Sequence, residues 1–399
     1  MRIVLISETF SKKMGYLANR LPKYLARLGV DVHVVIMDLP SYYQLKDFKQ
    51  TYGSFIDSEV LPVGTVEAYE GYTLHVLGHK KVLGYMRMVG LWDKLQAIRP
   101  DIVQALLSIG WIPFDAALAK PFLGYKLFTG SHTTASTFPL AKRKVSIWDG
   151  EQLKCLFTRT LPGRLISLVT KKCYGPTQDC AEIAWRFFGV QQHKVEVMHL
   201  GVDTEFFFPV SSEATVQERT AMRQQFGFSE NDIVCIYTGK LTEEKNALIL
   251  AKAVARLRAM EKPYYGLFIG DGVQKKSIQA HPWCTVLNFM PFYELAAYYR
   301  AADIGVWPTN ESTSTLDAAA CGIPIIVSDG IAYRKHVGGN GIVYKMNDLE
   351  DLINVLLKLR DRETRKRLGS FGAEKMARQF SWESIAMHRL KDYEAALRS

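Results

Sequence analysis

The 399-residue sequence lacks several patterns that define specialised classes of protein. It has six cysteines but no Cys-x-x-Cys pair, which argues against a disulfide scaffold or a redox pair and favours a reducing compartment. No apolar run reaches the roughly 18 residues of a membrane-spanning helix. The first apolar run is cut off by Glu8, too early for a signal peptide. We therefore expect a cytoplasmic protein that can still bind the inner face of a membrane peripherally.

Two ligand-binding motifs are also missing. The sequence has no Asp-x-Asp pair to hold a divalent ion and no complete Gly-x-Gly-x-x-Gly fingerprint for a dinucleotide. What is present is ordinary for a folded globular protein, with 48% hydrophobic and 23% charged residues. Lys and Arg number 50 against 40 Asp and Glu, for a net charge of +10. A basic surface favours phosphate-bearing partners, namely nucleotides, anionic lipids or nucleic acid.

Short β-branched runs alternate with helical periodicity along most of the chain, which predicts an α/β protein with parallel sheets. We expect a boundary near residue 200 between two such series, 1–200 and 201–380. The first predicted series contains strands at 2–7, 31–37, 101–105 and 125–129 and a helix at 19–28. The second contains strands at 232–237, 264–269 and 325–327 and a helix at 247–260. A final helix at 382–397 follows an apparently complete second sheet.

Residues that follow predicted strands are candidates for binding, because ligands of parallel sheets lie beyond the carboxyl ends of the strands. In the first series, two lysines and Gly15 follow the strand at 2–7, where backbone amides can approach an anion. A solvated basic loop is the alternative. His132 follows the strand at 125–129 among small polar residues. A single histidine is more often structural than functional, but this position favours function.

In the second series, the segment after the strand at 232–237 predicts an anion site. Thr242 is placed to cap the following helix, with Lys245 in its first turn. A cation at that position opposes the helix dipole, so an anion near Lys240 and Lys245 would explain it. The alternative is that Glu243 and Glu244 neutralise a surface lysine. Further along, Gly270-Asp271-Gly272 reads as a tight turn.

The segment 307–324 reads as a strand end, a polar loop, a two-turn helix, a glycine stop and a proline. Ser314 and Asp317 form a Ser-x-x-Asp capping box. Four consecutive hydroxyl residues, at 312–315, crowd a helix amino terminus that suits a phosphate or sugar hydroxyls. Capping does not explain Glu311 or the excess of hydroxyls, so the segment predicts a ligand site.

At these residues the chain resembles the retaining GT-B glycosyltransferases of family 4, also called glycosyl transferases group 1. Five elements agree in order and spacing: Gly201-Val202-Asp203 with Phe207 and Pro209, Thr238-Gly239-Lys240 with Lys245, Gly270-Asp271-Gly272, Glu294-Leu295 with 299–303, and 317–324. The resemblance implies two Rossmann-like domains whose parallel sheets face a cleft. Residues 1–200 would bind the acceptor, 201–380 would bind a nucleotide-sugar donor, and 381–399 would cross back to the first domain.

The resemblance also assigns roles to single residues. Lys240 and Lys245 would hold the diphosphate leaving group, Glu311 would face the donor sugar, and His132 would lie near that sugar. Asp317 would bind the ribose hydroxyls. The remaining residues expected to bind the donor are Gly15, Gly239, Gly270, Gly272, Ser314 and Thr315. Three positions depart from the family pattern: Glu311 and Asp317 have five residues between them instead of seven, Lys240 replaces an arginine, and the first loop has one glycine instead of two.

The implied reaction is a retaining, metal-independent hexosyl transfer from a UDP or GDP sugar to a hydroxyl acceptor, with no cofactor. A role in making cell-surface polysaccharide or glycolipid would suit such an enzyme. Two alternatives are a GT-B epimerase acting on nucleotide sugars and a non-catalytic binder of them. The Ser/Thr-rich region around Glu311 argues against the epimerase, which needs acid and base groups in the cleft. Nucleic acid is not expected as a partner, because no recognisable binding module is present.

The segment 142–172 mixes basic and apolar residues. It contains eight lysines and arginines against two acidic residues, interleaved with ten large apolar side chains. This pattern is typical of a segment that lies on an anionic membrane, as family members with lipid-linked acceptors use. An ordinary core helix with a solvated basic face is the alternative.

Overall fold

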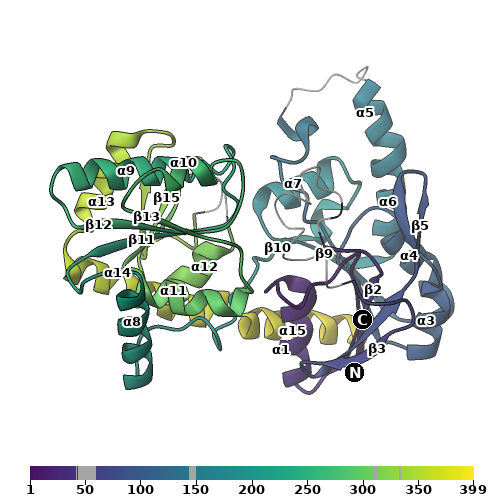
Figure 1. The fold of residues 1–399 in the computed structure, drawn as a ribbon. Coiled ribbons are helices and arrows are strands. Elements are labelled where there is room, and N and C mark those ends of the chain that lie inside the picture. Colours follow the sequence, from purple (N-terminus) through teal and green to yellow (C-terminus); the bar gives the residue numbers. More distant parts are fainter. Residues whose placement is uncertain (42, 44–59, 143–149, 310–311, 332–333) are drawn as a thin grey trace.

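The computed structural model of the chain describes residues 1–41, 43, 60–142, 150–309, 312–331 and 334–399. Two lobes stand side by side, each built around its own sheet, and the last helix runs from the junction between them beneath the first lobe (Figure 1). The predicted α/β architecture with two parallel sheets is confirmed. We call the lobe with the amino terminus the first lobe and the other the second lobe.

The first lobe contains an eight-stranded sheet in the order β10-β9-β8-β7-β1-β2-β4-β3. All neighbouring strands are parallel except β3 and β4. The strands are β1 (Arg2–Ile6), β2 (Asp31–Met37), β3 (Val66–Tyr69), β4 (Tyr72–Leu77), β7 (Ile102–Ala105), β8 (Lys126–Gly130), β9 (Thr170–Gly175) and β10 (Val195–Val197), with a separate hairpin of β5 (His79–Val82) and β6 (Tyr85–Met88). Its helices are α1 (Leu17–Arg27), α3 (Leu91–Ile98), α4 (Trp111–Leu123), α5 (Gly150–Cys155), α6 (Leu161–Val169) and α7 (Gln178–Arg186).

The second lobe contains a six-stranded parallel sheet in the order β13-β12-β11-β14-β15-β16. Its strands are β11 (Ile233–Thr238), β12 (Tyr264–Ile269), β13 (Cys284–Leu287), β14 (Ile304–Trp307), β15 (Ile325–Ser328) and β16 (Gly341–Tyr344). Its helices are α8 (Glu213–Gln225), α9 (Leu248–Ala259), α10 (Lys275–Gln279), α11 (Leu295–Ala301), α12 (Ser314–Ala320), α13 (Leu349–Lys358) and α14 (Arg362–Lys375). Each strand order has a switch point at its first strand, which is where ligands bind in such sheets.

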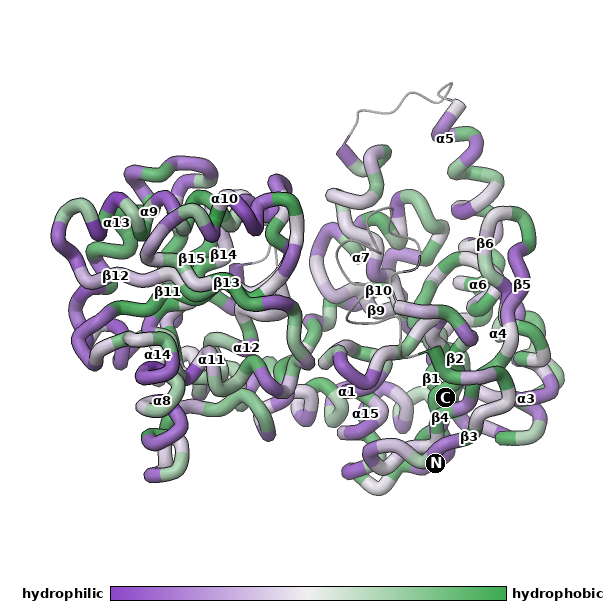
Figure 2. The backbone as a smooth tube through the Cα atoms, in the orientation of Figure 1, coloured by the Kyte–Doolittle hydropathy of each residue, from purple (hydrophilic) through white to green (hydrophobic). Residues whose placement is uncertain are grey.

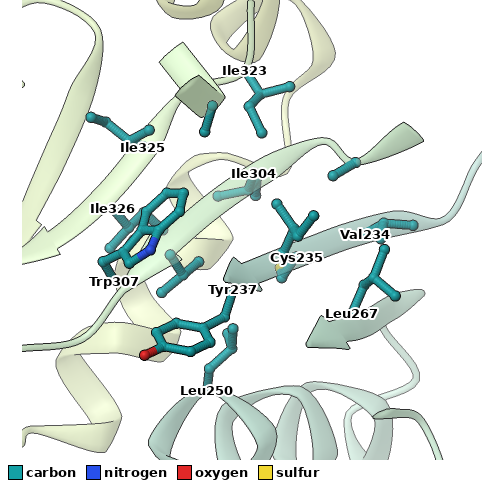
Figure 3. Close-up of a cluster of buried hydrophobic side chains, with 14 of the residues drawn as sticks. Val234, Cys235, Tyr237, Leu250, Leu267, Ile304, Trp307, Ile323, Ile325 and Ile326 are labelled. Atoms are coloured by element: carbon teal, nitrogen blue, oxygen red, sulfur yellow. The ribbon is translucent and has the colours of Figure 1, made fainter. Parts of the chain in front are cut away.

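The core of the second lobe explains why its central strands are continuous apolar runs. β11, β14 and β15 are buried along their whole length, because helices cover both faces of the sheet. Figure 3 shows Trp307 and Tyr237 at the ends of these strands, packed among aliphatic side chains. The Trp307 indole donates a hydrogen bond to the Thr238 carbonyl oxygen over 3.1 Å. The ends of β11 and β14 are thereby fixed to each other, and both end at the cleft side of the lobe.

The last helix, α15 (Trp382–Arg398), packs on the first lobe. Trp382, Ile385 and Tyr393 join the same buried cluster as residues of β1 and α1. At the crossing, the Val202 amide donates to the Phe380 carbonyl over 2.8 Å, and the Trp382 amide donates to the Val202 carbonyl over 3.0 Å. The two chain segments that connect the lobes are therefore hydrogen-bonded to each other.

Hydrophobic stretches concentrate on the inner strands, while the outer helices alternate between hydrophobic and hydrophilic residues (Figure 2). Among the described residues, no helix is both long enough and apolar enough to cross a bilayer.

Candidate functional site

A cavity of about 550 Å³ lies between the two lobes. Its walls come from the loops after β1, β8, β11 and β14 and from the segment after β13. The carboxyl ends of both sheets therefore border one space, as expected for a ligand site in parallel sheets. The volume lies within the usual range for small-molecule sites.

Two lysines form the cationic part of this cavity. Lys240 and Lys245 both line it, and so does Gly239. The Tyr237 hydroxyl donates to the Lys240 carbonyl over 2.8 Å, and the Gly239 amide donates to the Ile269 carbonyl over 3.0 Å. The loop that carries both lysines is thus tied to β11 and β12.

The helix predicted at 247–260 is found within one residue of those bounds, but the cap predicted at Thr242 is wrong. Helix α9 begins at Leu248, and residues 243–247 form turns before it. Asn246 has a left-handed φ of 46°, which a helix cannot include, so the helix begins only after it. Lys245 therefore belongs to a turn outside the helix. Its amide donates to the Thr242 carbonyl over 3.1 Å.

Gly270 and Gly272 support the lysine loop without lining the cavity. A Cβ on Gly270 would lie 1.8 Å from the Gly239 carbonyl oxygen, and one on Gly272 would lie 2.6 Å from the Leu241 carbonyl oxygen. Both have positive φ angles, 157° and 144°. Glycine is required at both positions so that the two loops can approach each other.

The hydroxyl-rich loop after β14 forms the wall beside the lysines. Ser312, Thr313 and Ser314 line the cavity, whereas Thr315 is buried and donates to the Ser312 carbonyl over 2.6 Å. The predicted capping box is wrong: α12 has Thr313 at its amino-terminal cap position, and no side chain caps it. Ser314 is already inside the helix, so its hydroxyl is not used as a cap. Glu311 lies outside the described residues.

Asp317 reaches the cavity from the first turn of α12. No described residue donates a hydrogen bond to its carboxylate. Enclosure by the surrounding protein, followed by the negative charge of Asp203, raises the pKa of Asp317 well above its usual range. A carboxylate in this state gains stability from any ligand that brings hydrogen-bond donors to it.

A further wall of the cavity is apolar and was not predicted from the sequence. It consists of Ile269, Phe289, Met290, Phe292 and Leu295. Three of these residues follow β13 directly, so the rule that ligands lie beyond strand ends also points to them. The signal was missed because β13 itself was not predicted, and apolar residues in such a run resemble an ordinary core.

The first lobe contributes fewer of the predicted residues. Gly15 lines the cavity, together with Thr134 from the loop after β8. His132 follows β8 at the same edge of the sheet but is not part of the lining. The side chain of His132 reaches solvent, yet much of it is enclosed by the surrounding protein. This enclosure, and secondly the positive charge of Arg389, lowers the pKa of His132 to about 4. The imidazole is therefore neutral at pH 7.

Asp203, at the linker between the lobes, also borders the cavity. Its carboxylate accepts hydrogen bonds from Arg20 (3.0 Å), Lys23 (3.0 Å) and Tyr24 (2.6 Å), all on α1. Arg20 and Lys23 are buried, so this carboxylate neutralises cations that water does not reach. The sequence indicated the Gly201-Val202-Asp203 element but not these partners.

Comparison with known proteins identifies the chain. The family model described as Glycosyltransferase Family 4 matches residues 14–206, and the model described as Glycosyl transferases group 1 matches residues 232–362. A D-inositol 3-phosphate glycosyltransferase of Stackebrandtia nassauensis is 27% identical over 321 residues, which cover 75% of this chain and 69% of the relative. Another, of Streptomyces bingchenggensis, is 31% identical over 56% of this chain and 52% of the relative.

Solved structures agree on the fold. Sucrose-phosphate synthase of Thermosynechococcus elongatus matches with a TM-score of 0.68 and 16% identity, covering 100% of this chain and 99% of that one. Anabaena HepE in complex with UDP and glucose matches with a TM-score of 0.67 and 16% identity, covering 99% and 100%. The chain belongs to glycosyltransferase family 4 and is a hexosyltransferase-type glycosyltransferase with the GT-B fold.

Proposed function

We propose that this enzyme transfers a sugar from a UDP or GDP sugar to a hydroxyl acceptor, with retention of configuration and without a metal ion. The observation that carries the proposal is a single cavity whose lining combines two lysines, Lys240 and Lys245, with an apolar wall. A nucleotide sugar has the same division, with a flat base at one end and a diphosphate further along. Solved complexes of the neighbour HepE with UDP and with UDP-glucose add support for this ligand class.

In this proposal each wall takes one part of the donor. The base lies against Phe289, Met290 and Leu295, which offer apolar and aromatic surface. The ribose hydroxyls donate to the Asp317 carboxylate, to which none of the described residues donates a hydrogen bond. Lys240 and Lys245 pair with the diphosphate, and the serine and threonine hydroxyls at 312–314 surround the same groups.

In this proposal the two lysines make the largest contribution to catalysis. When the bond between the anomeric carbon and the diphosphate oxygen breaks, negative charge develops on the leaving diphosphate. Fixed cations stabilise that charge and typically contribute a large share of the rate. The acceptor hydroxyl attacks the anomeric carbon from the face that the diphosphate leaves, and a phosphate oxygen takes the hydroxyl proton. No enzyme nucleophile is required.

Metal independence is part of the proposal. The sequence has no Asp-x-Asp pair, and the charges that face the leaving group are lysines. In the described part of the chain, one group of residues has metal-ligand spacing, Glu196 with His388 and Asp392, and none of the three lines the cavity. We propose, as the resemblance implies, that His132 and Glu311 act near the donor sugar. His132 would do so as a neutral hydrogen-bonding group.

Thermal unfolding with a panel of UDP, GDP and ADP sugars tests the donor site. A ligand that binds only the folded protein stabilises it by RT ln(1 + [L]/Kd), about 2.7 kcal/mol at one hundred times Kd. We expect one base to raise the melting temperature selectively, and Lys245→Ala to abolish the rise. Lys252→Ala, an exposed lysine on α9, is the matched control and should keep it. No rise with any nucleotide sugar in folded wild-type protein would contradict the proposal.

We further propose that the acceptor is presented at an anionic membrane, as part of cell-surface polysaccharide or glycolipid synthesis, with contact through 142–172. In the described part of this segment, α6 exposes Leu161, Leu165 and Leu168 by 47%, 59% and 59%. The neighbouring α4 adds Leu118 and Phe122, exposed by 49% and 77%. Burial, and then the nearby charges of Lys126 and Lys171, lower the pKa of Lys120. Burial, and then the charges of Lys171 and Lys120, lower the pKa of Lys194. An apolar ridge beside clustered lysines suits an anionic lipid surface.

Sedimentation with lipid vesicles tests this contact. We expect binding to vesicles that contain anionic lipid, weak binding to neutral phosphatidylcholine vesicles, and loss of binding in Leu165→Glu combined with Leu168→Glu. Val216→Glu, which changes a 51% exposed valine on α8, should bind like the wild type. Equal binding by the wild type and the Leu165/Leu168 variant would refute the membrane contact.

A further inference from the structure

The loop after β1 makes a direct contact with the second lobe. The Phe292 amide donates to the Lys13 carbonyl oxygen over 3.1 Å. Gly15 lies flat on the Phe292 ring: a Cβ on Gly15 would be 2.8 Å from Cδ2 and 3.1 Å from Cγ of that ring. These are atoms near the base of the side chain, which cannot move aside without moving the whole ring. Glycine is therefore the only residue type at position 15 that permits this close approach in the present arrangement.

The Phe292 ring is held from several sides. The Arg20 guanidinium lies over it at 4.9 Å, and the Phe206 ring contacts it edge-on at 5.4 Å. Arg20 is itself fixed by its buried ion pair with Asp203. α1 and α11 face each other across the gap between the lobes (Figure 1), and Phe292 precedes α11. The ring thus connects the first lobe, the linker and the second lobe.

We propose that Gly15 and Phe292 form a latch that holds the lobes closed over the donor cavity, and that Phe292 is a positioning residue for transfer. Both residues line that cavity, so separating them opens its wall to solvent. A closed site strengthens the pairing of the lysines with the diphosphate and keeps out water that competes with the acceptor. The kinetic part of this inference rests on the proposed donor site, whereas the structural part does not.

Opening of the lobes should appear in solution scattering of the protein without ligand. We expect Phe292→Ala and Gly15→Ala to have a larger radius of gyration than the wild type. Gly338→Ala is a matched control, because Gly338 has no positive φ. A Cβ added there would lie 4.0 Å from its nearest neighbour, the Lys335 carbonyl oxygen. Phe371→Ala, which changes a 50% exposed ring on α14, is the control for Phe292. Unchanged scattering in both latch variants would overturn the inference, whether or not a donor is known.

A double-mutant cycle separates the latch from direct contact with the donor. If Gly15→Ala acts through a steric clash with the Phe292 ring, it should change the donor KM little in a protein that already lacks that ring. We expect each single variant to raise the donor KM about tenfold, as when a tenth of the molecules are closed. The double variant should resemble Phe292→Ala alone. If the increases in donor KM of the two single variants multiply in the double variant, the two residues act separately, which contradicts the latch.

A second kinetic readout is the fate of the donor. With the cavity open, water attacks the anomeric carbon in place of the acceptor. The products are the free sugar, the nucleoside diphosphate and a proton. Both latch variants should raise the ratio of donor hydrolysis to transfer, and the two control variants should not. Failure of wild-type protein to bind any nucleotide sugar would reject the proposed donor site. Wild-type binding with an unchanged ratio in the variants would reject the latch alone.

Discussion

Asp203 and Asp317 border the same cavity, yet their surroundings are opposite. Asp203 accepts hydrogen bonds from three side chains of α1 and neutralises two buried cations. Asp317 has no donor among the described residues and lies close enough to Asp203 for the two charges to repel, which contributes to its raised pKa. The described residues thus satisfy the first carboxylate and donate no hydrogen bond to the second, which we propose binds a ligand.

This difference separates a structural from a functional carboxylate without reference to sequence motifs. A buried acid that the fold needs is surrounded by donors, since an unpaired buried charge costs several kcal/mol. An acid that serves a ligand is left in a state that the ligand improves, and such groups have perturbed pKa values. The following experiments test whether the two aspartates divide in this way.

The largest effect should come from Asp203→Ala. It leaves Arg20 and Lys23 buried without their shared counter-ion, and among the described residues only Glu70 and Glu205 remain paired with them. We expect the free energy of unfolding to fall by about 3–5 kcal/mol, as when one partner of a buried ion pair is removed. Urea denaturation measures this change. A loss below 1 kcal/mol would mean that the network is not structural.

Asp317→Asn should have the reverse profile. Unfolding stability at pH 7 should stay the same or rise, because an uncompensated charge is removed. The donor KM should increase about 10- to 100-fold, the range expected when a hydrogen bond to a charged group is lost. Asp93→Asn, an exposed aspartate on α3, serves as the control for both measurements. A large drop in stability with an unchanged KM would reverse the assignment of the two aspartates.

The stability of the wild type should also depend on pH through Asp317. Its pKa is higher in the folded than in the unfolded chain, so between the two values the folded protein binds more protons. Stability should therefore fall as the pH rises from about 4 through the folded-state pKa. Denaturation curves of the wild type minus those of Asp317→Asn isolate this slope. A flat difference curve would show that the carboxylate has its ordinary pKa.

The smallest effect should come from Glu205, at the exposed edge of the Asp203 network. Pairing with Arg27 first, and with Lys23 as well, lowers the pKa of Glu205 to about 2. Its stabilisation is thus complete above its ordinary pKa near 4.5 and is lost as the pH falls through about 2. Because the side chain is 42% exposed, Glu205→Gln should cost less than about 1 kcal/mol at pH 7. The difference between the two proteins should shrink in denaturation measured below pH 4.

The sequence predicted the extent of strands and helices more reliably than the capping residues of helices, and the reason is physical. The strands at 31–37 and 264–269 match β2 and β12 at both ends, because buried parallel strands are apolar throughout. The predicted helices at 247–260 and 382–397 also match α9 and α15 within one residue, whereas the caps predicted at Thr242 and Ser314 were wrong. A capping residue has the same side chain whether or not the backbone after it is helical, and Asn246 shows that it need not be.

The site shows the same division. Lys240, Lys245 and the 312–314 loop could be found because polar residues after a strand are unusual enough to notice. Phe292 could not, since an apolar residue near a strand end is indistinguishable from core in one sequence. Its contact with Gly15 joins positions 277 residues apart, which no local pattern predicts.

The crossing of α15 affects the order in which the protein can be completed during synthesis. Trp382, Ile385 and Tyr393 fill part of the core of the first lobe, yet they are synthesised after every strand of the second lobe. The six-stranded sheet has all its strands once Tyr344 has emerged. The lobe that is synthesised first is thus finished last, and until then the hydrophobic face under α15 is exposed for a chaperone to cover.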